Sequence, residues 1–283
     1  MNRDPLPLLK RLKINTVAAP DIDLIGSLYS EWLAYVECER GTISAELASS
    51  WGAPAMALRP YILLQPESGA DVFIRVVEID EVPDYKPMTT LGWNSFELII
   101  DDVYELRKNL NGSPFEIIGE PSPLDGELNF IHAMQVLGPA GDVLYLTCDT
   151  TRAADSLLPV PDSFVDRPFI VILAGVGVDT TQSYYCEKFL MKREEDMSTP
   201  IGVIAAAQGL PEDYAFEMGF MSLGESGNFI EYDGYSAGFS DRPCHKGQLP
   251  PGCSSVSFSV DSIDALNLDY LGKATLEPSI AYG

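Results

Sequence analysis

Two short stretches of the chain share a turn-and-strand pattern and differ at one residue that could do chemistry. Residues 138–146 read GPAGDVLYL and residues 224–232 read GESGNFIEY, so each has Gly-x-x-Gly, then Asp or Asn, then an apolar run. Tyr145 in the first stretch corresponds to Glu231 in the second. A glutamate on a buried strand can act as a general base when burial raises its pKa. Glu231 is therefore the candidate catalytic residue.

Few other side chains in the sequence suggest chemistry. The chain has two histidines. His132 lies in the apolar strand FIHAMQV, where we favour a histidine hydrogen-bonded beside the core over an acid–base role, and His245 lies in a turn-rich linker. Arg75 interrupts the apolar strand VFIRVVEI, so it either points to solvent, which the alternation favours, or meets an anion. We keep His132 and Arg75 as ligand-binding candidates.

The composition argues against several classes of partner. The 283 residues include 18 basic and 42 acidic side chains, and the resulting net charge of -24 repels nucleic acid and anionic membranes. The sequence shows neither the apolar run of a secretory signal nor a membrane span of roughly 20 apolar residues. Five cysteines without a CxxC pair favour a reducing compartment over a disulfide framework. We therefore expect a cytoplasmic protein without nucleic-acid or membrane partners.

The second half of the chain repeats the first. Residues 94–106 (NSFELIIDDVYEL) match residues 254–266 (SSVSFSVDSIDAL), and residues 21–33 match residues 176–190. The offsets between aligned aspartates, 160 residues in the first pair and 156 in the second, are nearly equal. The two Gly-x-x-Gly turns repeat at a shorter interval and divide each half again. This gives four modules, at about 12–80, 90–150, 167–236 and 252–283.

Each module has the pattern βαβββ. A half-buried strand comes first and ends at an aspartate, such as Asp101, that can cap the helix after it. Three strands follow, and the Gly-x-x-Gly turn joins the last two as a hairpin that needs positive φ. In module three we predict these strands as IGVIAAAQ, EMGFMSL and NFIEYDG.

This pattern predicts an α+β fold of paired modules in two tandem domains. Modules one and two form an N-terminal pair over residues 1–155, and modules three and four form a C-terminal pair over residues 167–283. The turn-rich stretch SLLPVPDSFVDRP, residues 156–168, is the expected boundary. Module four stops about where its second strand should end, so we expect this module to be incomplete.

Paired βαβββ modules with an aspartate-capped helix and a Gly-x-x-Gly-Asn hairpin resemble the vicinal oxygen chelate superfamily. This superfamily contains glyoxalase I, bleomycin- and fosfomycin-resistance proteins, and extradiol ring-cleaving dioxygenases. The resemblance covers nearly the whole chain, and four modules match the two-domain, dioxygenase-type layout. It implies that paired modules curl into open barrel-like mixed sheets around a cleft. It also implies a divalent metal (Fe, Mn, Zn or Ni) held by a first-strand histidine and a fourth-strand glutamate.

Carried onto this chain, the resemblance leaves the metal ligands missing. The first-strand positions are Thr16, beside Asn15, and Ser95, Ile172 and Ser255; the fourth-strand positions are Ile74, between Phe73 and Arg75, and Tyr145 and Glu231. One carboxylate does not hold a divalent ion tightly. We therefore predict no metal or other cofactor. The ligand-binding candidates are Tyr145, Ser95, His132, Ser255 and Arg75, with the functional cleft in the C-terminal half around Glu231.

Three functions stay open at this stage. The first is a metal-free protein that binds a small organic molecule in the C-terminal cleft. The second is a lyase, isomerase or dioxygenase-type enzyme in which Glu231 is the base or the sole carboxylate ligand, and Ser255 orients the substrate. The third is a structural role in which the modules form a pairing surface. The expected partner is a small organic molecule, and a homodimer is left open.

Overall fold

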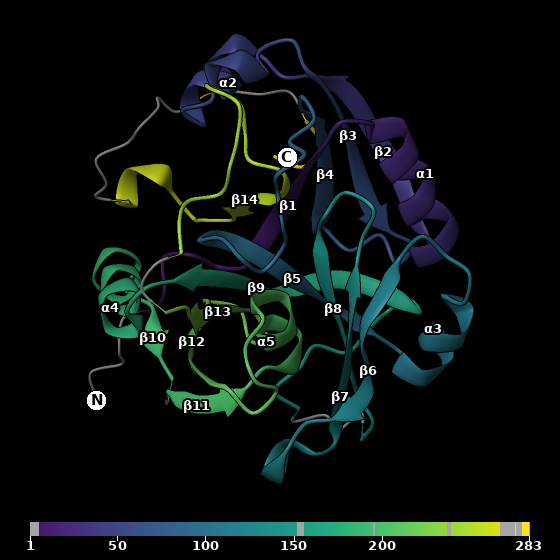
Figure 1. The fold of residues 1–283 in the computed structure, drawn as a ribbon. Helices are drawn as coiled ribbons and strands as arrows, with labels where there is room; N and C mark the ends of the chain where they lie inside the picture. The colour runs from purple at the N-terminus through teal and green to yellow at the C-terminus, as the bar shows by residue number, and fades with distance from the viewer. Residues whose placement is uncertain are drawn as a thin grey trace.

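The computed structural model describes residues 6–151, 156–194, 196–236, 239–266, 275 and 279–282. Within them the strands form two curled sheets, one of five strands and one of nine (Figure 1). The predicted α+β class, with paired βαβββ modules in curled mixed sheets, is confirmed. In the described ranges, no helix is long and apolar enough to cross a membrane.

Modules one and two contain the predicted strand, helix and three further strands. Module one comprises β1 (Leu12–Ala19), α1 (Ile22–Leu33), β2 (Tyr35–Thr42), α2 (Ala45–Ser50), η1 (Pro54–Met56), β3 (Pro60–Pro66) and β4 (Phe73–Glu78). Module two comprises β5 (Gly92–Ile100), α3 (Val103–Asn109), β6 (Glu116–Pro123), η2 (Gly126–Leu128), β7 (Ile131–Leu137) and β8 (Val143–Asp149). The side chain of Asp102, one residue beyond the expected Asp101, caps α3.

Modules three and four are less regular. Module three comprises β9 (Val165–Gly175), α4 (Val178–Phe189), β10 (Lys192–Arg193), β11 (Met197–Pro200), α5 (Gly202–Gln208), β12 (Ala215–Ser222) and β13 (Phe229–Gly234). Module four contributes β14 (Gly252–Phe258) and η3 (Ile263–Ala265). The rest of module four, where the incomplete second strand is expected, lies largely outside the described residues.

One predicted strand of module three is a helix. The stretch IGVIAAAQ forms α5, because three consecutive alanines followed by glutamine favour a helix. Gly209, with φ of 67°, takes the left-handed conformation that ends it. Ile204 and Ala205 are fully buried against Phe216 and Tyr235. Through these contacts α5 covers one face of the nine-stranded sheet (Figure 1).

The modules pair one with four and two with three. In the first three modules the first strand pairs in parallel with the fourth, β1 with β4, β5 with β8 and β9 with β13. The other edge of β5 pairs antiparallel with β9, and the other edge of β1 pairs antiparallel with β14. The strand orders are β14-β1-β4-β3-β2 in one sheet and β10-β12-β13-β9-β5-β8-β7-β6 in the other, where β11 also pairs with β12. The expected pairing of modules one with two and three with four is therefore wrong.

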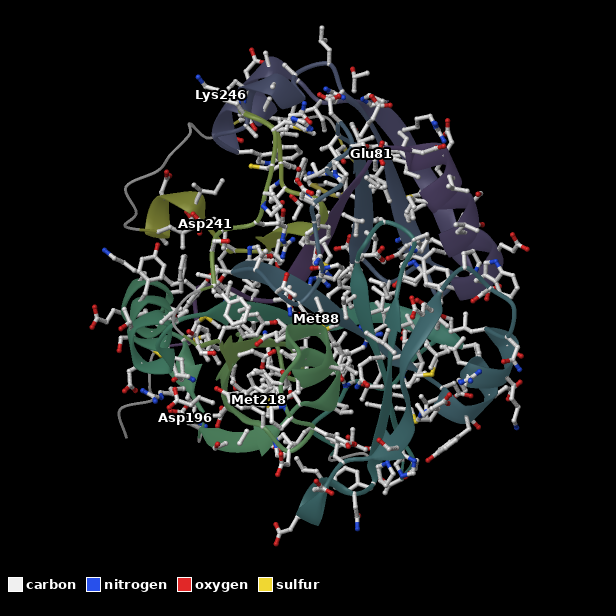
Figure 2. The ribbon with its side chains drawn as sticks, viewed as in Figure 1. Glu81, Met88, Asp196, Met218, Asp241 and Lys246 are labelled. Carbon is white, nitrogen blue, oxygen red and sulfur yellow. The ribbon has the colours of Figure 1, made fainter. Side chains whose placement is uncertain are left out.

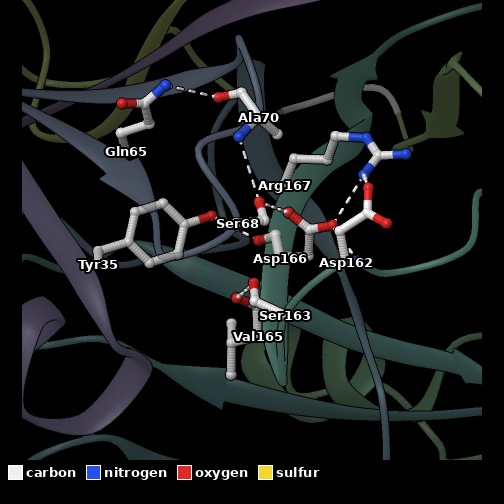
Figure 3. Close-up of polar contacts among 9 residues, drawn as sticks. All are labelled: Tyr35, Gln65, Ser68, Ala70, Asp162, Ser163, Val165, Asp166 and Arg167. Carbon is white, nitrogen blue, oxygen red and sulfur yellow. Dashed lines mark hydrogen bonds and ion pairs between the residues drawn. The ribbon is translucent and has the colours of Figure 1, made fainter.

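The stretch expected to be a domain boundary instead links module three to module one. The Tyr35 hydroxyl donates to the backbone carbonyl of Asp166 at 2.7 Å (Figure 3). The Ser68 hydroxyl donates to the Asp166 carboxylate at 2.6 Å, and Arg167 forms an ion pair with the same carboxylate at 2.7 Å. Module three pairs with module two through β5 and β9. The first strand of module four is then left to complete the sheet of module one.

The largest cluster of buried apolar residues joins the two sheets. The ring of Tyr29 on α1 packs edge-on against Phe115 of module two, with centroids 5.7 Å apart. The Tyr29 hydroxyl also donates to the fully buried carboxylate of Asp142, in the predicted GPAGD turn. Both Gly-x-x-Gly turns form as predicted, with φ of 72° at Gly141 and 77° at Gly227.

Candidate functional site

The face of the nine-stranded sheet beneath α5 gathers four ionisable side chains from three strands. Alternation along β13 directs both Glu231 and Asp233 to this face, and β5 and β8 contribute Glu97 and Tyr145. We call the surface formed by these four residues the acidic face. Glu97 and Glu231 are each 8% exposed, and Asp233 is fully buried. Met218, labelled in Figure 2, pairs with Asp233 from the neighbouring strand.

The strand register brings three of the predicted site residues together. Glu231 on β13 pairs with Ile172 on β9, and Ile172 pairs in turn with Ser95 on β5. Tyr145 on β8 pairs with Glu97 on β5. The Ser95 hydroxyl is buried, and it has no hydrogen-bond partner within the described part of the chain. Glu231 therefore faces module two, whereas the sequence analysis expected it to face module four.

Glu231 and Asp233 form a hydrogen-bonded pair of carboxyl groups. Burial raises the pKa of Glu231 well above its ordinary value, and the charges of Asp233 and Glu97 raise it further. Burial also raises the pKa of Asp233 to about 7, although its hydrogen bond with Glu231 works in the opposite direction. No amide or hydroxyl group of the described residues donates to either Asp233 oxygen. Both carboxyl groups therefore favour the protonated form more than a solvated carboxyl group does.

Glu97 and Tyr145 complete the acidic face without neutralising it. Burial raises the pKa of Glu97 to about 7, while a hydrogen bond with the Thr147 hydroxyl lowers it. Burial, and then the charges of Asp233 and Glu231, raise the pKa of Tyr145 well above 10, so its phenol stays protonated and can donate. None of the ion pairs formed by the described residues includes Glu97, Glu231 or Asp233. The acidic face therefore has no countercharge of its own.

The residues of the acidic face do not fit the divalent metal that the sequence resemblance implies. That site needs a first-strand histidine, whereas the first strands here contribute Glu97 and Ile172. Across the described ranges, no three His, Cys, Asp or Glu side chains converge as metal ligands must. A metal would also compete with protons for these carboxyl groups, because burial raises the pKa of both Glu231 and Asp233.

The remaining candidates Arg75 and Ser255 lie on the five-stranded sheet. Thr16 on β1 pairs with Arg75 on β4 and with Ser255 on β14, so these three residues form one row. Ile74, the expected fourth-strand position, packs into the core between the sheets. Arg75, the next residue on β4, points to the opposite side of this sheet, which we call its inner face. Its side chain is only 2% exposed, so the interpretation that it points to solvent is wrong.

Neither histidine reaches an inner face. His132 shares a strand face with Met134, which packs into the core between the sheets, and its Nδ1 lies 3.0 Å from the hydroxyl of Tyr104 on α3. This agrees with the hydrogen-bonded interpretation and places His132 away from the acidic face. The Nε2 of His245 lies 2.9 Å from the carbonyl oxygen of Glu81 in a loop.

The sequence analysis missed two members of the acidic face. Asp233 lies two residues after Glu231, so strand alternation alone places both on the same face. Glu97 is an acidic residue within the otherwise apolar run FELII, which is the same signal that drew attention to Arg75. Both residues could have been found by listing charged side chains on predicted buried strands.

Solved structures with a similar fold exist despite low sequence identity. Glyoxalase I from Zea mays aligns over 81% of this chain and 69% of its own, with 17% identity and a TM-score of 0.54. A putative dioxygenase from Bacillus subtilis subsp. subtilis str. 168 aligns over 82% of this chain and 66% of its own, with 11% identity and a TM-score of 0.53. No protein-family model and no curated protein matches the sequence. At these identities the likeness shows the fold alone.

Proposed function

We propose that this chain, which has the fold of the vicinal oxygen chelate superfamily, binds a small organic molecule on the acidic face without a metal ion. The ligand class that suits this face is an organic amine carrying a positive charge. The observation that carries the proposal is the buried Glu231–Asp233 pair, which has no cationic partner among the described residues. Buried carboxyl groups without a countercharge reduce stability, and such groups cluster at functional sites.

The surroundings of the carboxyl pair support a ligand with an apolar body and a charged end. Apolar and aromatic side chains beside the acidic face include Ile172, Phe220 and Tyr235. Tyr145 remains protonated and can donate a hydrogen bond, and the unpartnered Ser95 hydroxyl offers a further contact. A few polar groups in an apolar wall are typical of small-molecule sites.

Access to the acidic face requires a shift of α5. This helix has seven residues, and apolar contacts of Ile204 and Ala205 hold it in place. The Gln208 side chain adds one hydrogen bond, from Nε2 to the carbonyl of Met88 at 2.9 Å (Met88 is labelled in Figure 2). A short helix held by so few groups is suited to open for a ligand.

Calorimetry with benzylamine as the probe tests this proposal. We expect benzylamine to bind, with an affinity that rises between pH 6 and pH 8 as the carboxyl groups ionise. Binding at pH 6 should release protons, because a cation stabilises the ionised carboxylates; comparing heats in two buffers measures this release. Neutral benzyl alcohol should bind at least about ten-fold more weakly, a difference of about 1.4 kcal/mol.

Two glutamine variants locate the binding. Glu231→Gln should weaken benzylamine binding at least about ten-fold, because it removes one of the two carboxyl groups that can ionise beside the bound amine. Glu217→Gln changes an exposed glutamate on the adjacent strand β12 and should leave binding unchanged. Equal affinity for benzylamine in wild type and Glu231→Gln would reject the acidic face as the amine site.

Proton transfer, as in a lyase or isomerase, is the second candidate function. The specific observation in its favour is that burial brings the pKa values of Asp233 and Glu97 to about 7, where a carboxyl group can both give and accept a proton at neutral pH. Deuterium exchange into hydroxyacetone in heavy water, followed by NMR, tests this function. Exchange that is catalysed by wild type and lost in Glu231→Gln supports it, and equal rates in both proteins reject it.

A further inference from the structure

The inner face of the five-stranded sheet contains a buried cation that forms no ion pair with any other described residue. Arg75 on β4 is 2% exposed. Its Nη2 donates to the Tyr282 hydroxyl at 2.6 Å, while its Nε has no hydrogen-bond partner among the residues that the structure describes. A buried guanidinium normally pairs with a carboxylate or phosphate, because a neutral hydroxyl compensates little of its lost hydration.

Aromatic rings surround the Arg75 guanidinium. Its central carbon lies 5.5 Å from the ring of Trp51, 5.7 Å from that of Tyr61 and 5.5 Å from that of Tyr282. Trp51 and Tyr61 are only partly buried, so this cage reaches the molecular surface. Cation and ring stacking of this kind favours a flat ligand that lies between the rings while its charged group meets the arginine.

Glu39 lies close enough to Arg75 to feel its charge but forms no ion pair with it. Burial opposes ionisation of Glu39, but hydrogen bonds from the Tyr61 hydroxyl, the Ile280 N–H and Ser279, together with the charge of Arg75, outweigh burial, so the pKa of the carboxyl lies below its ordinary value. Its carboxylate is therefore committed to these donors, and none of the ion pairs of the described residues joins it to Arg75.

Residues 279–282 occupy the space over Arg75. Ala281 is fully buried in a small apolar cluster of the inner face with Ile14, Leu63 and Phe73. The N–H of Ile280 donates to Glu39 at 2.9 Å, and Tyr282 supplies one ring of the cage. Ile280 and Tyr282 are still 50% and 43% exposed. The segment therefore rests on few contacts, and its tyrosine gives Arg75 a hydroxyl where a carboxylate would bind better.

We propose that Arg75, Trp51 and Tyr61 form a second ligand site, which takes a small aromatic carboxylate, and that residues 279–282 compete for it from within the same chain. The carboxylate replaces the Tyr282 hydroxyl on Nη2 and reaches the unpartnered Nε, which gives the two-point contact that arginine makes with carboxylates. The aromatic ring replaces that of Tyr282 beside the Arg75 guanidinium. This site lies on a different sheet from the acidic face and does not depend on the function proposed there.

Benzoate binding to the full chain and its variants tests the second site. In Tyr282→Ala the competing side chain is removed, so the affinity for benzoate should rise at least about ten-fold, since a ligand no longer has to displace the Tyr282 ring and hydroxyl. Tyr104→Ala is the matched control, because Tyr104 is also 43% exposed, and it should bind benzoate as wild type does. Arg75→Lys in the Tyr282→Ala background keeps the positive charge but loses the two parallel N–H donors of the guanidinium. The affinity for benzoate should therefore fall at least about ten-fold relative to Tyr282→Ala.

Hydrogen exchange of wild type provides a measurement that does not depend on how the variants fold. Saturating benzoate should speed amide exchange at Ile280 and Tyr282, because the ligand displaces the segment, whereas benzyl alcohol should not. Unchanged exchange under saturating benzoate overturns the competition. Equal benzoate affinity in wild type and Tyr282→Ala, or no effect of Arg75→Lys, overturns the site.

Discussion

The substitution Glu97→Gln should make the protein more stable above neutral pH. Glu97 is buried on the acidic face, where burial raises the pKa of its carboxyl from 4.5 to about 7. Folding therefore favours the protonated form. The stability that this protonated form provides is fully present below pH 4.5 and is lost as the pH rises through 7. Glutamine has nearly the same shape and never ionises, so the variant does not undergo this loss.

The size of the pKa shift of Glu97 determines how much stability the substitution should add. A rise from 4.5 to about 7, at about 1.36 kcal/mol for each pH unit, corresponds to about 3 kcal/mol of unfolding free energy. We expect Glu97→Gln and wild type to differ by less than about 0.5 kcal/mol at pH 4.5, and the variant to be more stable by about 2–3 kcal/mol at pH 8. The larger value in this range applies if glutamine keeps the contacts that the protonated Glu97 side chain makes.

Urea unfolding at pH 4.5, 6, 7 and 8 measures this difference, with the midpoint and slope compared between proteins. Glu116→Gln, at an exposed position on β6, is the control and should follow wild type at every pH. A Glu97→Gln variant whose advantage is the same at all four pH values would refute the reasoning, as would a variant less stable than wild type at pH 8. A glutamate whose removal stabilises the fold is best explained by a role in binding or proton transfer.

Two further predictions concern the contacts that join the modules. Tyr29→Phe leaves the buried carboxylate of Asp142 without its hydroxyl donor and should lower the free energy of unfolding by about 1–3 kcal/mol, measured with urea; a loss below about 0.5 kcal/mol would contradict this role. Asp166→Ala removes the acceptor shared by Ser68 and Arg167 and should lower the melting temperature by several degrees, followed by circular dichroism. An unchanged melting temperature would mean that the stretch before β9 does not anchor module three.

Local features of this fold follow from local sequence. The alternation in NSFELII and DVLYLTC predicts two strands that form, and Gly141 and Gly227 adopt the positive φ that their turns require. The strand predicted for IGVIAAAQ is wrong. A short apolar run is compatible with either a strand or a buried helix, and its alanines favour the helix. This error hid the helix that covers the acidic face.

The pairing of the modules could not be read from the repeats. Every first strand offers the same kind of free edge, so the sequence of one module does not state which partner it takes. The choice depends on contacts between distant residues, such as those of Asp166 with Ser68 and Tyr35. The expected pairing grouped Glu231 with Ser255, which lie on different sheets.

The pairing also determines the charge of each inner face. If module one paired with module two as expected, Arg75 and Glu97 would share an inner face, where a guanidinium and a carboxylate could neutralise each other. The observed pairing places Glu97 beside Glu231 and Asp233 and leaves Arg75 opposite Thr16 and Ser255. Two buried groups of opposite charge are thereby kept apart, and neither forms an ion pair with another described residue. A covering helix over the acidic face and a covering segment over Arg75 then keep both faces from water, and a ligand of the complementary charge can replace either cover.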